Sequence, residues 1–266
     1  MPRDLLVLSG GHPYDEPAFA ALLAGLDGWS VTHLRHPEAE RLVGEGRATQ
    51  ADAMLFYDMP GFVFANGTVA TRPPSEAFRC AIIARFAAGR GAVAMHHALA
   101  GWAEWPEWAE FVGGRFLYQP GVLRGRVTPD SGYRHDVGYT AEVIADHPVT
   151  AGLPATFAVI DELYLAQVFE SEITPLVVAR HEFVRDNFYS AAAAVAGRMF
   201  DNAGWDHPPA AASIAWTKRA AAADLVYLQC GDGPQTYANP EVRRLLANAL
   251  AFTSKPAPQS DPDLCA

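Results

Sequence analysis

The sequence predicts an α/β fold: an open, doubly wound and mostly parallel sheet with helices on both faces. Over residues 4–96, short apolar runs alternate with segments of helical spacing, in the order strand, helix, strand, helix, strand, helix, strand. The third strand, "ADAMLFYDM" at 51–59, holds a continuous apolar run that is typical of a parallel strand covered on both faces. Half of the 266 residues are hydrophobic, which is enough for a full core.

In the first half of the chain each element has its own local signal. We expect strands at 4–11, 29–36, 51–59 and 91–96, and helices at 15–28, 37–46 and 74–91. One face of the first helix is apolar because its large side chains recur at helical spacing, as Phe19, Leu22, Leu23 and Leu26 show. Pro74 and Ser75 mark the start of the third helix and Gly89 marks its end.

The second half of the chain is less regular. Strands are expected at 138–144, 176–180, 212–217 and 224–231, and a closing helix at 239–252 begins with Asn239 as its cap and Pro240 in its first turn. The alanine-rich segment 187–213 is either a helix plus a loop or a flap. We expect one domain over residues 1–252 and a loose, proline-rich tail over 253–266.

Composition excludes several classes of protein. Twenty basic residues against 30 acidic ones give a net charge of −10, which argues against nucleic acid or an anionic membrane surface as a partner. Three cysteines are too few for a disulfide framework and suggest a reducing compartment. Cys80 and Cys230 are expected in the core and Cys265 in the tail. No apolar run is long enough for a signal peptide or a membrane span, so we expect a cytoplasmic protein.

Polar residues follow several of the predicted strands. In an open α/β sheet, ligands bind at the carboxyl ends of the strands. The ends of the first, third and fourth strands offer these residues there: His12, Tyr14, Asp15, Glu16; Tyr57, Asp58; His96, His97. The turn after the fourth strand holds no cysteine or serine, so a nucleophile elbow is not expected. The first turn lacks a complete G-x-G-x-x-G and its acidic residues would repel phosphate, so no nucleotide cofactor is expected.

Other candidates lie outside these strand ends. Asp161 and Glu162 are adjacent carboxylates in the apolar stretch "FAVIDELYLAQVF", a pattern that favours orientation of a histidine or general acid–base work. A divalent metal is left open, with these residues as suitable ligands at no diagnostic spacing: His12, His96, His97, Glu162 and His181. Trp102 is expected to lie over a sugar ring, and the aromatic residues from Trp105 to Tyr118 to pack in the core.

Several of these segments recur together in one known family. The pieces "VLSGGHPYDEPAF", "GAVAMHHALAGW", "WAEFVGGRF", "ADHPVTAGLPATFAVIDELY" and "GDGPQTYANPEVRRLLANAL" resemble the trehalose-utilisation (ThuA-like) family over about residues 5–252. The resemblance implies a flavodoxin-like sheet of the class I glutamine amidotransferase type, and a role with trehalose or related disaccharides, often as 3-keto derivatives. It also implies that His96 stands at the turn that holds the glutaminase cysteine in distant relatives.

The same resemblance assigns further positions. Motif positions are matched by His12, Arg115, Phe116, His147, Asp161, Glu162 and Tyr164. Two positions depart from the family: Asp232 stands where a Gly-His-Asp motif often has its histidine, and Gln119 stands where many members have a histidine after Gly-Gly-Arg-Phe.

These observations predict an enzyme that acts on a trehalose-related or keto-sugar substrate by histidine acid–base chemistry, through elimination, hydrolysis or isomerisation. The candidate catalytic residues are His96 as a neutral base or acid, His12 as its partner and Glu162 as orienter or second acid, whereas His97 is expected to pack or orient. Candidates for holding the sugar are Tyr14, Asp15, His97, Trp102, Arg115, Phe116, Asp161, Tyr164 and Asp232. The alternatives are a non-catalytic sugar-binding or interaction module and a metal-dependent hydrolase; homo-oligomers are left open.

Overall fold

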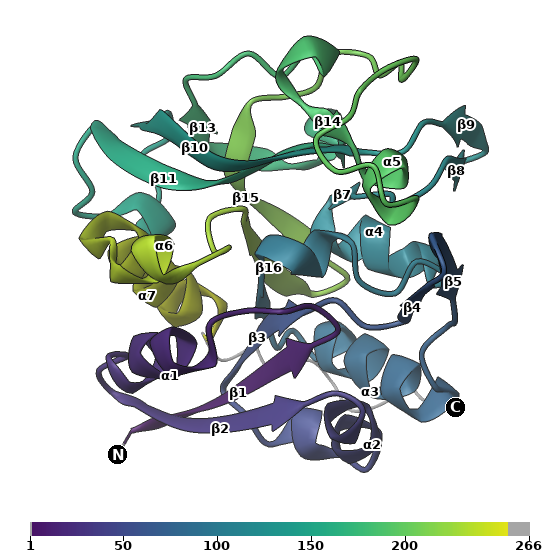
Figure 1. Ribbon diagram of the computed structural model, residues 1–266. Coiled ribbons are helices and arrows are strands. Elements are labelled where there is room, and N and C mark those ends of the chain that lie inside the picture. Colours follow the sequence, from purple (N-terminus) through teal and green to yellow (C-terminus); the bar gives the residue numbers. More distant parts are fainter. Residues whose placement is uncertain (1, 255–266) are drawn as a thin grey trace.

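The computed structural model describes residues 2–254, and within them one ten-stranded sheet organises the chain (Figure 1). Its strands run in the order β11-β10-β13-β15-β16-β6-β3-β1-β2, and β14 pairs with β10. The bounds are β1 Arg3–Gly10, β2 Trp29–Arg35, β3 Ala53–Asp58, β6 Ala92–Met95, β10 Gly132–Val143, β11 Thr156–Leu165, β13 Thr174–Ala179, β14 Tyr189–Ser190, β15 Ser213–Ala220 and β16 Ala223–Leu228.

The direction of the strands changes partway across the sheet. Strands β2, β1, β3, β6 and β16 pair in parallel, and this half contains the four strands predicted from residues 4–96. From β16 to β11, each neighbouring pair is antiparallel. Every residue of β3 is buried, as its apolar run predicts. How the chain divides into domains stays a prediction.

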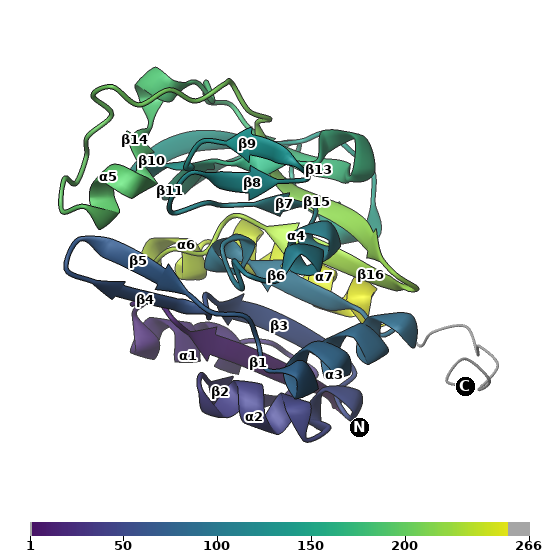
Figure 2. The ribbon, with the colours of Figure 1, turned by 90° about the vertical axis from the view of Figure 1, so that its right-hand side faces the viewer.

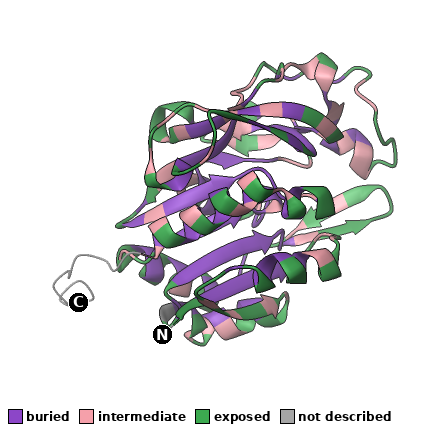
Figure 3. Cartoon of the chain, turned by 90° about the vertical axis from the view of Figure 1, so that its left-hand side faces the viewer, coloured by how far each residue is buried: buried purple, intermediate pink, exposed green. Residues whose placement is uncertain are grey.

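Helices cover both faces of the sheet, as predicted. Buried residues of α1 and α7 pack against one face, and those of α2, α3 and α4 pack against the other. The helices are α1 Glu16–Ala24, α2 Glu38–Gly44, α3 Glu76–Ala87, α4 Pro106–Val112, α5 Ala191–Val195, α6 Pro234–Ala238 and α7 Pro240–Thr253. The 3₁₀ turns are η1 Arg47–Thr49, η2 His96–Leu99, η3 Pro148–Thr150, η4 Glu170–Glu172 and η5 Arg185–Asn187. The strands are mostly buried and the outer faces of the helices mostly exposed (Figure 3).

The sheet curls strongly, so that its antiparallel edge comes to lie over its centre. Five strand spacings separate β11 from β6, which would be about 24 Å in a flat sheet. Instead, His96 at the end of β6 lies 3.2 Å from Glu162 on β11. Figure 1 shows β10, β11 and β13 as an upper layer that β15 joins to the parallel half. Register shifts between β13 and β15, beside Pro175, accompany this bend.

Three small two-stranded sheets were not predicted from the sequence. They pair β4 (Phe62–Ala65) with β5 (Thr68–Thr71), β8 (Gly121–Leu123) with β9 (Arg126–Thr128), and β7 (Gly114–Arg115) with β12 (Gln167–Val168). The first is a hairpin whose turn residues, Asn66 and Gly67, have positive φ angles of 51° and 71°. Asn-Gly between apolar runs is the sequence signal for such a turn. This hairpin extends beyond the sheet below α5 (Figure 2).

Some expectations about single segments need correction. Cys80 is exposed on α3 rather than buried, whereas Cys230 is buried as predicted. The expected tail overlaps α7 by one residue, because Thr253 is still helical and buried; positions 255–266, including Cys265, lie outside the described residues. Segment 187–213 combines β14 and α5 with a long loop. No helix among residues 2–254 is long and apolar enough to cross a membrane.

Candidate functional site

A cavity of about 300 Å³ opens at the carboxyl ends of the parallel strands. His12 follows β1, Met59 follows β3, His97 follows β6 and Asp232 follows β16, so each parallel strand except the edge strand β2 contributes a residue. The curled antiparallel layer, the β4–β5 hairpin and segment 187–213 close the remaining sides with Phe64, Tyr133, His135, Glu162, Tyr164, Ala191, Ala194 and Met199. The cavity therefore lies where the sheet topology predicts a ligand site.

The turn after β6 is strained at His96. Met95 is extended, with φ −123° and ψ 132°, but His96, the first residue of η2, takes a left-handed φ of 50°. A non-glycine residue in this region costs about 1–3 kcal/mol and persists only where its surroundings fix it. Gly231 packs against this turn so closely that a Cβ there would lie 2.7 Å from Met95 Cε and 3.2 Å from His96 Cβ.

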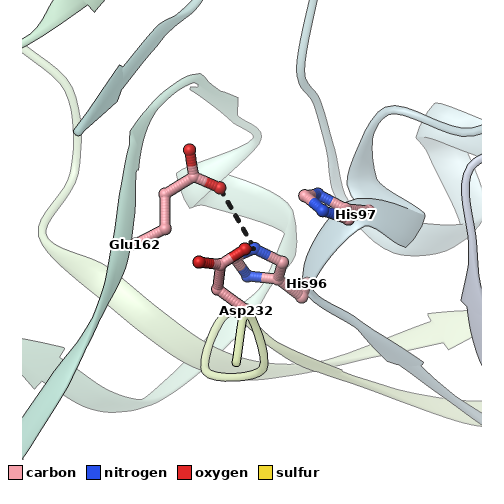
Figure 4. Close-up of side chains that lie close together, drawn as sticks. All are labelled: His96, His97, Glu162 and Asp232. Atoms are coloured by element: carbon pink, nitrogen blue, oxygen red, sulfur yellow. Dashed lines mark hydrogen bonds and ion pairs between the residues drawn. The ribbon is translucent and has the colours of Figure 1, made fainter. Parts of the chain in front are cut away.

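The ring of His96 is fully buried and lies between two carboxylates (Figure 4). Its Nδ1 donates a hydrogen bond of 2.5 Å to the carbonyl oxygen of Gln229. Its Nε2 lies 2.8 Å from the Tyr164 hydroxyl, 3.2 Å from Glu162 Oε2 and 3.5 Å from Asp232 Oδ1. Burial opposes a charge on the ring, but hydrogen bonds to Asp232 and Glu162 outweigh it and raise the pKa of His96 well above its ordinary value. The raised pKa favours the protonated ring, whereas the sequence led us to expect a neutral base at His96.

His97 lines the cavity beside His12. Its Nδ1 lies 2.6 Å from the hydroxyl of Tyr164, and its ring centre lies 4.0 Å from that of His12. Burial, reinforced by neighbouring histidines, lowers the pKa of His97 well below its ordinary value, and burial also lowers the pKa of His12. The lowered pKa values favour neutral rings near pH 7. Both ring nitrogens of His12 lie 3.1 Å from backbone carbonyl oxygens, those of Pro13 and Tyr57, so His97 is the ring better placed to accept a proton. The placement of the adjacent histidines differs from the expected one: His97 faces the cavity, and His96 is buried and does not line it.

The adjacent carboxylates on β11, Asp161 and Glu162, point to opposite faces of the strand and make different contacts. Glu162 lines the cavity, and its Oε1 lies 3.2 Å from His135 Nδ1. Asp161 accepts hydrogen bonds of 2.7 and 3.0 Å from the backbone N–H groups of Gly231 and Asp232. Burial raises the pKa of Asp161 to about 6. Asp161 does not line the cavity; it holds the loop that presents Asp232, whose pKa His96 lowers although burial opposes this.

His135 lines the cavity and was missed in the sequence. It lies on β10 at an irregularity between Arg134 and Val137, where Asp136 has a φ of 52°. Such a bulge re-aims a side chain, and here it brings His135 to Glu162. A signal was available: the polar pair His135-Asp136 interrupts an otherwise strand-like run.

Two residues expected to hold a sugar are part of the core. Trp102 is 1% exposed and packs against Phe78, with ring centres 5.3 Å apart, so it offers no face to the cavity. Arg115 is buried and donates hydrogen bonds to the carbonyl oxygens of Ala100, Gly101 and Trp105, which fixes the chain after η2. Trp102 and Arg115 thus stabilise the segment that follows η2 and do not hold a ligand.

Other candidates also lie off the cavity wall. Asp15 caps α1 by accepting a hydrogen bond of 2.8 Å from Ala18 N–H. The hydroxyl of Tyr14 lies 2.9 Å from Ser9 Oγ, although its ring packs against His12. Asp58 lies 2.7 Å from His36 in a buried pair. Phe116 and Tyr164 do line the cavity; His147, Gln119 and His181 do not.

Cys230 and a cluster of four residues that could hold a metal ion bear on nucleophilic and metal chemistry. Cys230 lies 3.3 Å from the hydroxyl of Tyr139, and burial raises the pKa of its thiol to about 12, so it is not an activated nucleophile. Donor atoms of His96, His97, Glu162 and Asp232 all lie within 4.8 Å of one another. His12 and His181, also weighed as ligands, are not in this group.

Comparison with known proteins places these residues in context. The model of the trehalose-utilisation (ThuA) family matches residues 6–253. Putative ThuA-like proteins from Parabacteroides merdae and Bacteroides uniformis are similar in structure, at 14% and 17% identity with TM-scores of 0.66 and 0.62. The first match covers 99% of this chain and 94% of that one, and the second covers 95% and 91%. No curated protein sequence matches the chain.

A more distant likeness bears on the fold. PurLQS from Thermotoga maritima is 10% identical, with a TM-score of 0.51 over 94% of this chain and 98% of that one. The class I glutamine amidotransferase-like fold predicted from the sequence is confirmed. In this chain the turn after β6 holds His96 and His97 and no cysteine or serine.

Proposed function

Since the chain belongs to the trehalose-utilisation (ThuA) family, we propose that it is an enzyme that acts on a small trehalose-related or keto-sugar substrate by histidine acid–base chemistry. The observation that carries this proposal is the placement of His97. Its ring lies in the cavity wall, and its Nδ1 is hydrogen-bonded to the Tyr164 hydroxyl. The ring of His12 packs against it edge to face, with ring centres 4.0 Å apart.

The composition of the cavity wall supports a carbohydrate ligand. Aromatic rings suit the C–H faces of a sugar, and Phe64, Phe116, Tyr118, Tyr133 and Tyr164 supply them. Carboxylates accept hydrogen bonds from sugar hydroxyls, and Glu162 and Asp232 supply these. A volume of about 300 Å³ is at the small end of ligand sites, which suits one or two sugar rings better than a polymer.

The proposed chemistry begins with proton abstraction. A ketone acidifies the C–H bond beside it, and His97 Nε2 takes that proton while the Tyr164 hydroxyl at Nδ1 stabilises the protonated ring. The electron pair of the broken C–H bond forms an enolate. Protonated His97 then returns this proton, either to a glycosidic oxygen as its bond to carbon breaks or to the enolate itself. The first outcome is elimination and the second is isomerisation.

The test follows the abstracted proton. Wild-type protein is incubated with 3-keto-trehalose in D₂O, and NMR measures deuterium uptake beside the ketone and product formation. His97→Ala is expected to lower both by about 10²-fold or more, the usual contribution of a general base. His33→Ala is the matched control, because His33 is exposed on β2 and outside the cavity, and it is expected to behave as wild type.

Two results would contradict the proposal. One is undiminished deuterium uptake in a folded His97→Ala variant. The other is tight binding of keto-disaccharides by the wild type with neither exchange nor product, which would favour a non-catalytic sugar-binding module. The cytoplasmic location, homo-oligomeric state and absence of nucleic-acid and nucleotide ligands stay predictions from the sequence.

A further inference from the structure

We propose that His96, Glu162 and Asp232 form a binding site for one divalent transition-metal ion of the Zn²⁺ class. Both nitrogen and carboxylate oxygen donors are present, which suits such ions better than Mg²⁺ or Ca²⁺. The site stands on the geometry of these side chains and does not depend on the identity of the sugar.

The hydrogen bond at the far side of His96 fixes which nitrogen can bind. Nδ1 donates to the Gln229 carbonyl at 2.5 Å, so Nε2, which lies 2.8 Å from the Tyr164 hydroxyl, is the ring nitrogen that can turn to an ion. A backbone carbonyl behind the imidazole is the usual support of a metal-binding histidine. The ring is fully buried and its turn is strained, so its direction is fixed before any ion arrives.

The spacing of the donor atoms matches one coordination sphere. Ligands at zinc distances in a tetrahedral site are about 3.4 Å apart. His96 Nε2 lies 3.2 Å from Glu162 Oε2 and 3.5 Å from Asp232 Oδ1. The donor atoms of all three residues lie within 4.8 Å of one another, close enough to share one ion, and Figure 4 shows the three side chains side by side.

Both carboxylates are supported from behind. The other oxygen of Glu162, Oε1, lies 3.2 Å from His135 Nδ1. Asp232 sits on a loop that Asp161 holds through two backbone hydrogen bonds. Metal sites are built in this way, with outer groups that orient the ligands.

A donor atom of His97 also lies within 4.8 Å of the other three, but Nδ1 of His97 is engaged by the Tyr164 hydroxyl at 2.6 Å, so His97 is not counted as a ligand. The three remaining ligands leave a fourth position for an exogenous ligand. Glu162 and Asp232 line the cavity, so that position faces the space beside His97. Catalytic zinc sites have this composition, with a water or substrate oxygen as the fourth ligand. A bound ion would polarise a carbonyl or hydroxyl oxygen of the ligand and leave His97 free to exchange a proton.

The site is tested by metal binding alone, without substrate. Protein freed of its affinity tag and stripped with EDTA is titrated with Zn²⁺, and elemental analysis after gel filtration gives the stoichiometry. We expect one zinc per chain in the wild type, and affinity reduced about a hundredfold or more in Glu162→Gln. Asp232→Asn, at a partly exposed side chain, is a second variant should the first fail to fold. Glu107→Gln, an exposed carboxylate on α4, is the control.

Cobalt gives an independent readout, because Co²⁺ in a four-coordinate site absorbs strongly in the visible. That absorption is expected in the wild type and in Glu107→Gln, and lost in both site variants. Wild-type affinity in Glu162→Gln and Asp232→Asn, or no metal retained by the wild type, would overturn the site. Zinc binding without deuterium exchange into keto-sugars would instead remove only the proposed function.

Discussion

The left-handed backbone of His96 depends on a single glycine nearby. A Cβ at Gly231 would lie 2.7 Å from Met95 Cε, 3.1 Å from Met95 Cγ and 3.2 Å from His96 Cβ, so the buried Met95 side chain would have to shift. We predict that Gly231→Ala lowers the free energy of unfolding by about 1–3 kcal/mol, the usual cost of overpacking. Gly233→Ala is the control, because its Cβ would meet only the flexible end of Gln235, at 3.2 Å. Urea denaturation measures both; equal stability of the two variants would contradict this view of the turn.

Single residues could be predicted from the sequence where the strand ends alone decide their place. His12 and His97 follow apolar strands, and both reach the cavity. The charge on His96 could not be predicted, because it depends on Glu162 and Asp232, which are distant in sequence and brought near only by the curl. His135 was missed because a bulge, rather than the strand pattern, aims it.

At the scale of elements, ion pairs attach the β8–β9 hairpin to the rest of the molecule. Arg124 in its turn pairs with Glu110 on α4 and with Glu172 on η4, and Glu172 also pairs with Lys218 on β15. Hydrogen bonds from Arg124 and Lys218 lower the pKa of Glu172 from 4.5 to about 2. A carboxylate whose pKa is lowered by folding stabilises the protein fully at pH values above its ordinary pKa of 4.5, and this contribution is lost as the pH falls toward 2.

Substitution of Glu172 should therefore matter near neutrality and not in acid. We predict that Glu172→Gln unfolds more easily than wild type at pH 7, and that the difference narrows steadily below pH 4.5. Urea midpoints measured across this range give the comparison. Glu107→Gln, which makes no ion pair among the described residues, should match wild type throughout. A difference that stays constant down to pH 3 would contradict the assigned role.

Helices and strands could be predicted where the signal lies within the element's own sequence. The alternating strands and helices of residues 3–95 appear where expected, because each depends on its own apolar pattern and caps. The β4–β5 hairpin was missed, although the Asn66-Gly67 pair is typical of a hairpin turn. The pairs β7–β12 and β8–β9 are too short for any periodicity to show.

At the scale of the whole molecule, the curl of the sheet could not be predicted from any local sequence pattern. Strand order and the contact between edge and centre depend on packing across the entire chain. The parallel half was predictable because strand–helix alternation permits few topologies. The antiparallel half, which supplies Glu162, Tyr164 and His135, had to be seen in three dimensions.

Hydrogen exchange should reveal this organisation directly. Strand β3 is wholly buried between β1 and β6, so its amides are expected to exchange slowest, near the limit of global unfolding. The β4–β5 hairpin is mostly exposed and pairs with no third strand, so it is expected to exchange fastest among the strands compared. Mass spectrometry of peptides covering 53–58 and 62–71 makes the comparison. Equal protection of the two would contradict it.

The curl also decides when the site comes into existence. Its polar residues span positions 12 to 232, so nearly the whole chain must emerge from the ribosome and fold before any part of the site can work. A chain that ends before Asp232 cannot form the complete cavity wall. Conversely, a ligand that contacts both His97 and Glu162 fastens the sheet's centre to its edge. Its binding energy then adds to the cooperative stability of the protein as a whole, and saturation with ligand protects distant strands from unfolding.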